Sequence, residues 1–180
     1  MKKAIEEAEY IIAFGRVCDS LKSMEKNLIK VQKVDEIISY IRKKEDVLVL
    51  ASGDPCFYGI TDFLKAKNIV IERILPGISS FQYMMTKLKK SWQGAQLLSF
   101  HGKDEGFERV KNNKLSIILT DAKIPPSQIS EKLKTMSAKG RIYAGYNLSY
   151  DDERIIEADI GKKFEDISPL AVVVIENEMD

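Results

Sequence analysis

The sequence has 180 residues, of which 44% are hydrophobic and 31% are charged. At a typical ~150 residues per domain, this length corresponds to one domain or two small ones, and the apolar content is sufficient to form a core. The 28 basic and 27 acidic residues leave a formal charge of +1, which argues against a nucleic-acid coat and a polybasic membrane binder. We therefore expect a globular protein with no nucleic-acid or membrane partner.

The sequence shows no pattern of a membrane span, a signal peptide or a structural metal site. The longest apolar runs, residues 47–51 and 171–175, are far shorter than the ~20 residues of a spanning helix. Residues 1–7 are charged and predict an amphipathic helix. Cys18, Cys56 and a single histidine form neither a disulfide framework nor a zinc site. A cytoplasmic protein without a bound metal is expected.

Short apolar runs rich in valine and isoleucine alternate with helical patterns in the first half of the chain. Bounded runs of this kind are typical of buried strands in a parallel sheet, and helices between them are typical of crossover connections. The predicted strands are residues 10–14, 28–31, 47–51 and 69–75, and the predicted helices are residues 34–41 and 79–88.

The second half of the chain has more closely spaced strand patterns, which favour mixed or antiparallel pairing. Strands are predicted at residues 96–99, 116–120, 141–146, 155–159 and 171–175, with a helix at residues 127–136 directly after a proline pair. We therefore predict an α/β chain of two lobes, residues 1–90 with a parallel sheet and residues 95–180 with a mixed sheet, with a boundary near residues 89–95.

Small polar residues follow several of the predicted strands. The third strand runs into Ser52-Gly53-Asp54-Pro55 and then Phe57-Tyr58, and the fourth runs into Pro76-Gly77-Ile78-Ser79-Ser80 at the start of a helix. Open α/β sheets bind ligands at the carboxyl ends of their strands, and a helix start offers free N–H groups. Taken singly, each loop is better explained as an ordinary turn or helix cap, as are Thr120-Asp121 and Asn147-Leu148-Ser149.

Together and in this order, the loops resemble those of the tetrapyrrole (corrin and porphyrin) methyltransferases, which use S-adenosylmethionine. Leu98-Ser99-Phe100-His101-Gly102-Lys103 resembles a Ser-x-His-Gly-basic signature of one subgroup, the cobalt-precorrin-7 or precorrin-6Y C(5)-methyltransferases of cobalamin biosynthesis. Asn147-Leu148-Ser149 and the following Glu153-Arg154 extend the resemblance, which covers residues 4–176.

The resemblance implies a two-lobed fold and methylation of a corrin precursor, with the cofactor between the lobes. It implies no covalent nucleophile, and we assign no side chain as the catalyst. The implied cofactor-binding residues are Ser52, Gly53, Asp54 and Phe57, with Ser79 and Ser80 near the methionine end and Leu119, Thr120 and Asn147 around the adenosine. The implied substrate-binding residues are Tyr58, His101 and Lys103, of which the lysine is suited to a carboxylate arm of the macrocycle.

Other interpretations stay open at this point. His101 is equally explained as a hydrogen-bonded structural residue. The chain is alternatively a methylase of another target in the same fold family, or a non-catalytic or partner-dependent relative. The resemblance also allows for a homodimer and for a decarboxylating methyltransferase partner.

The sequence departs from the family pattern at its start. Family members usually begin with an apolar strand and a Gly-x-Gly-Pro-Gly-Asp-like loop, whereas residues 1–8 here resemble the end of the helix that follows them. The family's first strand would lie inside the first sheet. Without it, neighbouring strands are expected to lack ladder partners in the first lobe.

Overall fold

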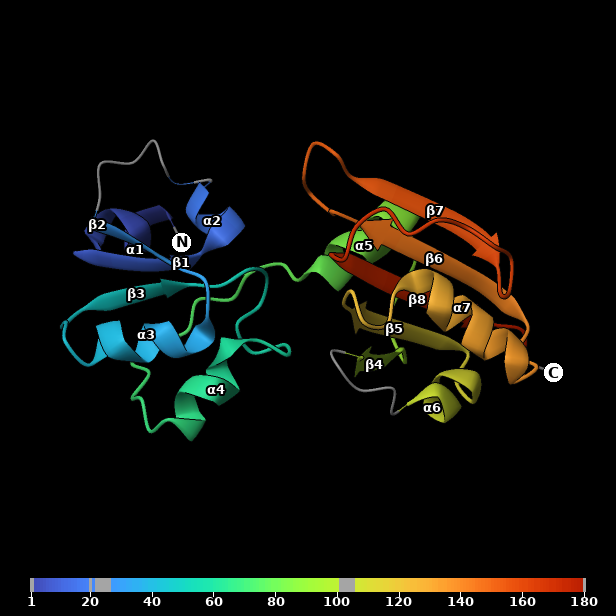
Figure 1. Ribbon diagram of the computed structural model, residues 1–180. Helices are drawn as coiled ribbons and strands as arrows, with labels where there is room; N and C mark the ends of the chain where they lie inside the picture. Colours follow the sequence, from blue (N-terminus) through green and yellow to red (C-terminus); the bar gives the residue numbers. More distant parts are fainter. Residues whose placement is uncertain (1, 20, 22–26, 101–105, 180) are drawn as a thin grey trace. The chain divides into compact units, whose positions relative to one another are not determined.

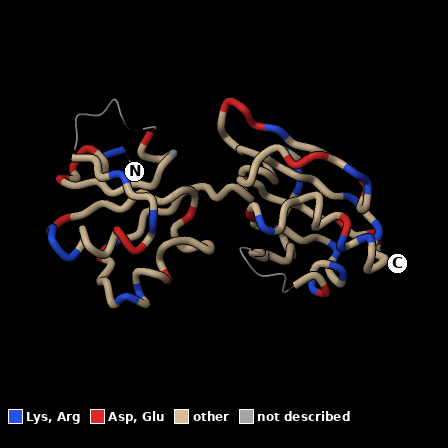
Figure 2. The backbone as a smooth tube through the Cα atoms, viewed as in Figure 1, with Lys and Arg blue, Asp and Glu red and all other residues tan. Residues whose placement is uncertain are grey.

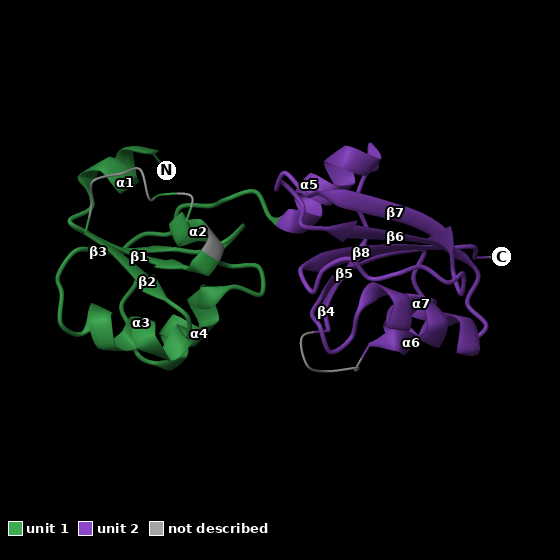
Figure 3. Cartoon of the chain, turned by 45° about the horizontal axis from the view of Figure 1, so that its top comes forward, with its two compact units in different colours: residues 1–79 green, residues 80–180 purple. Residues whose placement is uncertain are grey.

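The computed structural model describes residues 2–19, 21, 27–100 and 106–179, and the chain divides into two compact units, Met1–Ser79 and Ser80–Asp180 (Figure 3). The helix at residues 80–88 thus packs with the second unit. The two units meet at residues 79 and 80, and the lobe boundary expected near residues 89–95 stays a prediction.

The first unit is built around a parallel sheet of three strands in the order β2-β1-β3. Alternate residues of β1 point to opposite faces, so Ile11 and Ala13 pack with Cys18, and Ile12 packs with Val31 and Ile37. Figure 1 shows α1 and α2 on one face of this sheet and α3 and α4 on the other. In chain order the elements are α1 (Lys2–Glu7), β1 (Tyr10–Phe14), α2 (Gly15–Asp19), β2 (Asn27–Val31), α3 (Val34–Ile41), β3 (Val47–Leu50) and α4 (Ile60–Ala66).

The strand predicted at residues 69–75 is wrong, because this segment has no regular secondary structure. Ile69 and Ile71 pack against the core, but no strand among the described residues forms a ladder with this segment. Val70 is 93% exposed. The apolar residues of this segment produced a strand-like sequence pattern because they pack against the core. A strand also needs a hydrogen-bonded neighbour, which this segment lacks among the described residues.

The second unit contains a five-stranded mixed sheet in the order β4-β5-β8-β6-β7. β4 and β5 are parallel, and the remaining pairs are antiparallel, which confirms the predicted mixed sheet and all five strands. The elements are α5 (Ser80–Leu88), β4 (Gln96–Ser99), α6 (Phe107–Lys111), β5 (Leu115–Thr120), α7 (Pro126–Thr135), β6 (Gly140–Tyr146), β7 (Arg154–Asp159) and β8 (Ala171–Asn177).

Helices cover both faces of this second sheet (Figure 1). Ile129 and Leu133 of α7 pack with Ile142, Val173 and other core residues on one face. On the other face α5 approaches β6 so closely that a Cβ atom added to Gly145 would lie 2.6 Å from the sulfur of Met84. A side chain larger than hydrogen at Gly145 would therefore displace the ends of the Met84 and Leu148 side chains that pack against it.

Candidate functional site

Two loops that the sequence singled out, residues 52–59 and 76–79, contact each other through their backbones in the first unit. A Cβ atom added to Gly77 would lie 2.4 Å from the carbonyl oxygen of Gly53, and one added to Gly53 would lie 3.3 Å from the Cα of Ser79. Gly53 also has a positive φ of 72°. The glycines therefore allow an approach that no other residue type permits.

The loop that follows β3 is held by hydrogen bonds within itself. Asp54 Oδ1 accepts from the backbone N–H of Cys56 at 2.8 Å, and the Asp54 carbonyl accepts from the N–H of Phe57 at 3.1 Å. The Thr61 hydroxyl donates to the carbonyl of Pro55 at 2.7 Å. Asp54 is half-buried and Ser52 is exposed. The loop thus presents a fixed carboxylate and a hydroxyl rather than a mobile chain.

The same loop carries a pair of aromatic rings. The rings of Phe57 and Tyr58 are in edge contact, with their centroids 4.9 Å apart. Tyr58 is 58% exposed and has a φ of 48°, in the left-handed region. An exposed ring held by an unusual backbone conformation offers an apolar surface with a polar tip to a flat ligand.

The two serines at the end of the second loop differ in environment. Ser79 is buried, whereas Ser80, the first residue of α5, is exposed. Because the first turn of a helix has N–H groups without intrahelical partners, Ser80 stands where a polar ligand group can be bound.

In the second unit, strand register brings three further predicted residues to one edge of the sheet. Thr120 at the end of β5 and Tyr146 at the end of β6 both pair with Ala171 at the start of β8. Leu119, Thr120 and Asn147 therefore lie at this edge, which we call the Ala171 edge. The chain leaving β4 reaches it as well, because the N–H of Phe100 donates to the carbonyl of Leu119 at 2.8 Å.

The polar side chains at the Ala171 edge already bind protein groups. The Thr120 hydroxyl donates to the carbonyl of Ile124. Asn147 uses both ends of its amide: Nδ2 donates to Asp152 at 2.7 Å, and Oδ1 accepts from the Ser168 hydroxyl at 2.8 Å. These side chains fix the turns at this edge, so they hold the backbone of the candidate site in place.

A third anchor at the Ala171 edge did not emerge from the sequence as a site feature. Glu153 accepts from the N–H of Ser149 at 2.7 Å and pairs with Lys87 of α5 at 2.9 Å. These contacts, the backbone hydrogen bond first, lower the pKa of Glu153 below its ordinary value. In the sequence, only the Glu153-Arg154 dipeptide of the family resemblance pointed to this residue. Sequence spacing alone does not reveal its contact with a helix more than sixty residues earlier.

Tyr146 supports the same edge from within the core. Burial, followed by a 2.8 Å hydrogen bond to Asp166, raises the pKa of its phenol, so the hydroxyl stays protonated and donates. Asp166 also accepts from the N–H of Ser127 in the first turn of α7 at 3.1 Å. One carboxylate therefore ties the end of β6 to the start of a helix.

His101 and Lys103 lie outside the described residues. Among the residues that are described, no cluster of three or more histidine, cysteine, aspartate or glutamate side chains could hold a metal ion. The same part of the chain contains no helix with the length and apolar character of a membrane span.

Comparison with known proteins identifies the family of this chain. The sequence profile of the tetrapyrrole (corrin/porphyrin) methylases matches residues 2–163. The chain belongs to this family. It is 33% identical over 147 residues to the cobalt-precorrin-7 C(5)-methyltransferase of Salmonella typhimurium, covering 79% of this chain and 73% of that one. It is 30% identical over 171 residues to a probable cobalt-precorrin-7 C(5)-methyltransferase of Methanocaldococcus jannaschii, covering 85% and 78% of the two chains.

Solved structures show the same tetrapyrrole methylase fold. The precorrin-6Y methylase of Archaeoglobus fulgidus superposes with a TM-score of 0.74 at 24% identity, covering 99% of this chain and 90% of that one. The uroporphyrin-III C-methyltransferase of Thermus thermophilus, solved in complex with S-adenyl homocysteine, gives 0.76 at 17% identity, covering 97% and 88%. The predicted fold class and family are confirmed.

Proposed function

We propose that this tetrapyrrole methylase transfers a methyl group from S-adenosylmethionine to C(5) of cobalt-precorrin-7 in cobalamin biosynthesis. Support for the reaction comes from relatives of that name that are at least 30% identical over most of the chain. The observation that carries the cofactor assignment is the direct contact between the loops at Gly53 and Gly77, which gathers the polar groups of two chain segments.

The chemistry of the described residues fits S-adenosylmethionine. The Asp54 carboxylate and the hydroxyls of Ser52 and Ser80 suit the amino acid end of the molecule, which carries both an ammonium and a carboxylate. The half-buried Leu119 suits an adenine ring. When bound, the cofactor would supply the methyl group as an electrophile. The residues proposed to hold it are Ser52, Gly53, Asp54, Phe57, Ser79, Ser80, Leu119, Thr120 and Asn147.

The contacts described above support two different roles for the proposed cofactor-binding residues. We infer that Ser52, Asp54 and Ser80 present side-chain groups, whereas Thr120 and Asn147 act through the shape of the turns that they stabilise. In methyl transfer the protein must align donor and acceptor and exclude water, and it needs no covalent nucleophile. Rigid turns serve that purpose.

For the substrate, we propose that Tyr58 covers part of the macrocycle and that Lys103 pairs with one of its carboxylate arms. We also propose His101, two residues before Lys103 in the sequence, as a substrate-binding residue. Five other expectations stay predictions. They are the absence of a bound metal, a cytoplasmic location, a homodimer, a decarboxylating partner, and lobes at residues 1–90 and 95–180.

Calorimetric titration of the full chain with S-adenosylmethionine, followed by turnover of cobalt-precorrin-7, tests the proposal. We expect a micromolar dissociation constant, about −8 kcal/mol, and a product whose mass corresponds to replacement of one hydrogen by one methyl group. No heat with millimolar cofactor would refute the methyltransferase assignment. Binding without turnover of this substrate, but with turnover of another corrin precursor, would refute the C(5) assignment.

A charge reversal separates the substrate from the cofactor. Lys103→Glu is expected to raise KM for the macrocycle at least tenfold while leaving the affinity for S-adenosylmethionine unchanged. Lys132→Glu is the matched control, because it makes the same charge change at an exposed lysine of α7. It should alter neither KM nor the affinity for S-adenosylmethionine. Equal effects of the two variants on KM would show that net charge alone is responsible.

A further inference from the structure

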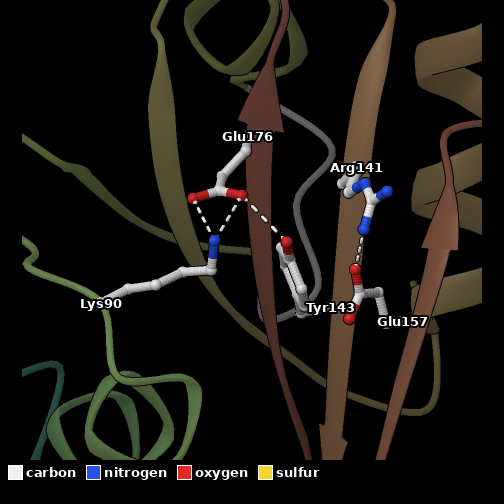
Figure 4. A network of polar contacts seen from close by, with 5 residues as sticks. All are labelled: Lys90, Arg141, Tyr143, Glu157 and Glu176. Atoms are coloured by element: carbon white, nitrogen blue, oxygen red, sulfur yellow. Dashed lines mark hydrogen bonds and ion pairs between the residues drawn. The ribbon is translucent and has the colours of Figure 1, made fainter.

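Two similar networks of lysine, glutamate and tyrosine tie the region of α5 to the sheet of the second unit. Lys87 in the last turn of α5 pairs with Glu153 at 2.9 Å and lies 5.2 Å from the ring of Tyr83. Lys90, two residues beyond the helix, pairs with both oxygens of Glu176 at 2.9 Å. The Tyr143 hydroxyl donates to Glu176 at 3.0 Å (Figure 4).

The two networks stand at opposite ends of the strands. Glu153 directly precedes Arg154, which pairs with Tyr146 at the Ala171 edge. Glu176 pairs instead with Leu115 and Arg141, near the other ends of β5 and β6. The Lys87–Glu153 pair therefore lies beside the candidate binding residues, whereas the Lys90–Glu176 pair lies at the far edge of the sheet.

Glu153 closes the turn formed by residues 147–153. Its carboxylate accepts from the N–H of Ser149, while the N–H of Tyr150 donates to the carbonyl of Asn147. Asn147 and Ser149 have φ values of 46° and 69°, a region that residues other than glycine rarely adopt. Such a conformation persists where surrounding contacts hold it. The carboxylate of Glu153 is one of these contacts.

Resting on the proposed function, we infer that Glu153 and Lys87 are positioning residues for the cofactor. Their ion pair holds the turn of residues 147–153 against α5, and this keeps Asn147 at a fixed spacing from Ser80 at the other end of that helix. Neither charged group needs to touch the cofactor. Loss of the pair lets the turn and the helix move independently, so part of the binding energy is then needed to order them.

The geometry limits the size of the effect. The side chain of Glu153 is 18% exposed and that of Lys87 is 45% exposed, so the pair is partly screened by water. Pairs of this kind contribute modestly, and we expect a loss of about two- to fivefold in cofactor affinity. Glu153→Gln removes the charge but keeps an acceptor for Ser149, whereas Glu153→Ala removes both and should weaken binding further.

The experiment measures the dissociation constant of S-adenosylmethionine and the thermal midpoint for the full-length variants. Glu153→Gln and Lys87→Met should each weaken binding, the double variant should be no worse than either single one, and Lys87→Arg should bind as the wild type does. Glu176→Gln is the matched control, because it breaks an equally short lysine pair in the same unit. It should lower the midpoint without changing the affinity.

Each outcome decides a separate point. Unchanged affinity in Glu153→Gln, or an equal loss in Glu176→Gln, would overturn the positioning role while leaving the proposed function intact. A wild-type chain that binds no S-adenosylmethionine would overturn both. Additive losses in the double variant would show that Glu153 and Lys87 act separately, which also contradicts the inference.

Discussion

Gly77→Ala tests whether the contact between the two glycine loops forms the site. An alanine Cβ would lie 2.4 Å from the carbonyl oxygen of Gly53 and 3.2 Å from its carbonyl carbon. Non-bonded heavy atoms normally stay about 3.5–4.0 Å apart. Since both atoms belong to backbone, no side-chain rotation relieves the overlap. The loops must separate by about 1 Å.

The magnitude follows from two opposing effects. Overpacking of this kind costs about 1–3 kcal/mol. Replacing glycine with alanine also restricts the unfolded chain, which stabilises the protein by about 0.4–1 kcal/mol. The φ of Gly77 is outside the left-handed region, so backbone strain adds nothing. We expect a net loss of about 1–2 kcal/mol, together with at least tenfold weaker cofactor binding, because displaced loops no longer present their groups together.

Urea denaturation and calorimetry measure these two quantities, and Gly15→Ala is the control. A Cβ atom added to Gly15 meets nothing within 4 Å, and its φ is also outside the left-handed region. Only the restriction of the unfolded chain should therefore act. It should raise the free energy of unfolding by up to about 1 kcal/mol and leave the cofactor affinity unchanged. If Gly77→Ala behaved like Gly15→Ala in both measurements, the loop contact would not define the site.

Three further substitutions test other parts of the site. Asp54→Ala should reduce cofactor affinity by far more than the about 1 kcal/mol expected for one lost hydrogen bond; unchanged calorimetry would remove Asp54 from the site. Gly145→Ala should cost about 1–3 kcal/mol of stability in urea, because its Cβ would lie 2.6 Å from the sulfur of Met84 and 3.0 Å from a methyl group of Leu148; wild-type stability would show that these side chains rotate out of the way without cost. Tyr146→Phe should cost about 1–2 kcal/mol through loss of the hydrogen bond to Asp166, and an unchanged thermal midpoint would contradict that.

Local patterns were sufficient to predict most strands, because a strand buried on both faces needs a continuous apolar run. The same rule failed at residues 69–75, where Ile69 and Ile71 contact the core without a hydrogen-bonded neighbour. Apolar periodicity reports burial, and burial alone does not specify a ladder. Helices α2, α4 and α6 were not predicted, because at five to seven residues they are too short for a helical period to emerge.

Within the candidate site, the sequence predicted the loops but not the partners of their side chains. Thr120 and Asn147 were expected beside the cofactor, and both lie at the Ala171 edge, yet their side chains bind Ile124, Asp152 and Ser168. A polar residue in a turn has the same sequence signal whether it faces a ligand or holds the turn. The partner is set by the tertiary structure.

By itself the sequence determined the family, the α/β class and the positions of the polar loops, because these depend on residue types at short spacing. The tertiary structure alone decided which of these groups meet. Gly53 meets Gly77, Glu153 meets Lys87, and Asp166 binds the first turn of a helix 39 residues earlier in the chain. Such contacts depend on strand order and on how closely helices approach the sheets, and these are properties of the packed chain as a whole.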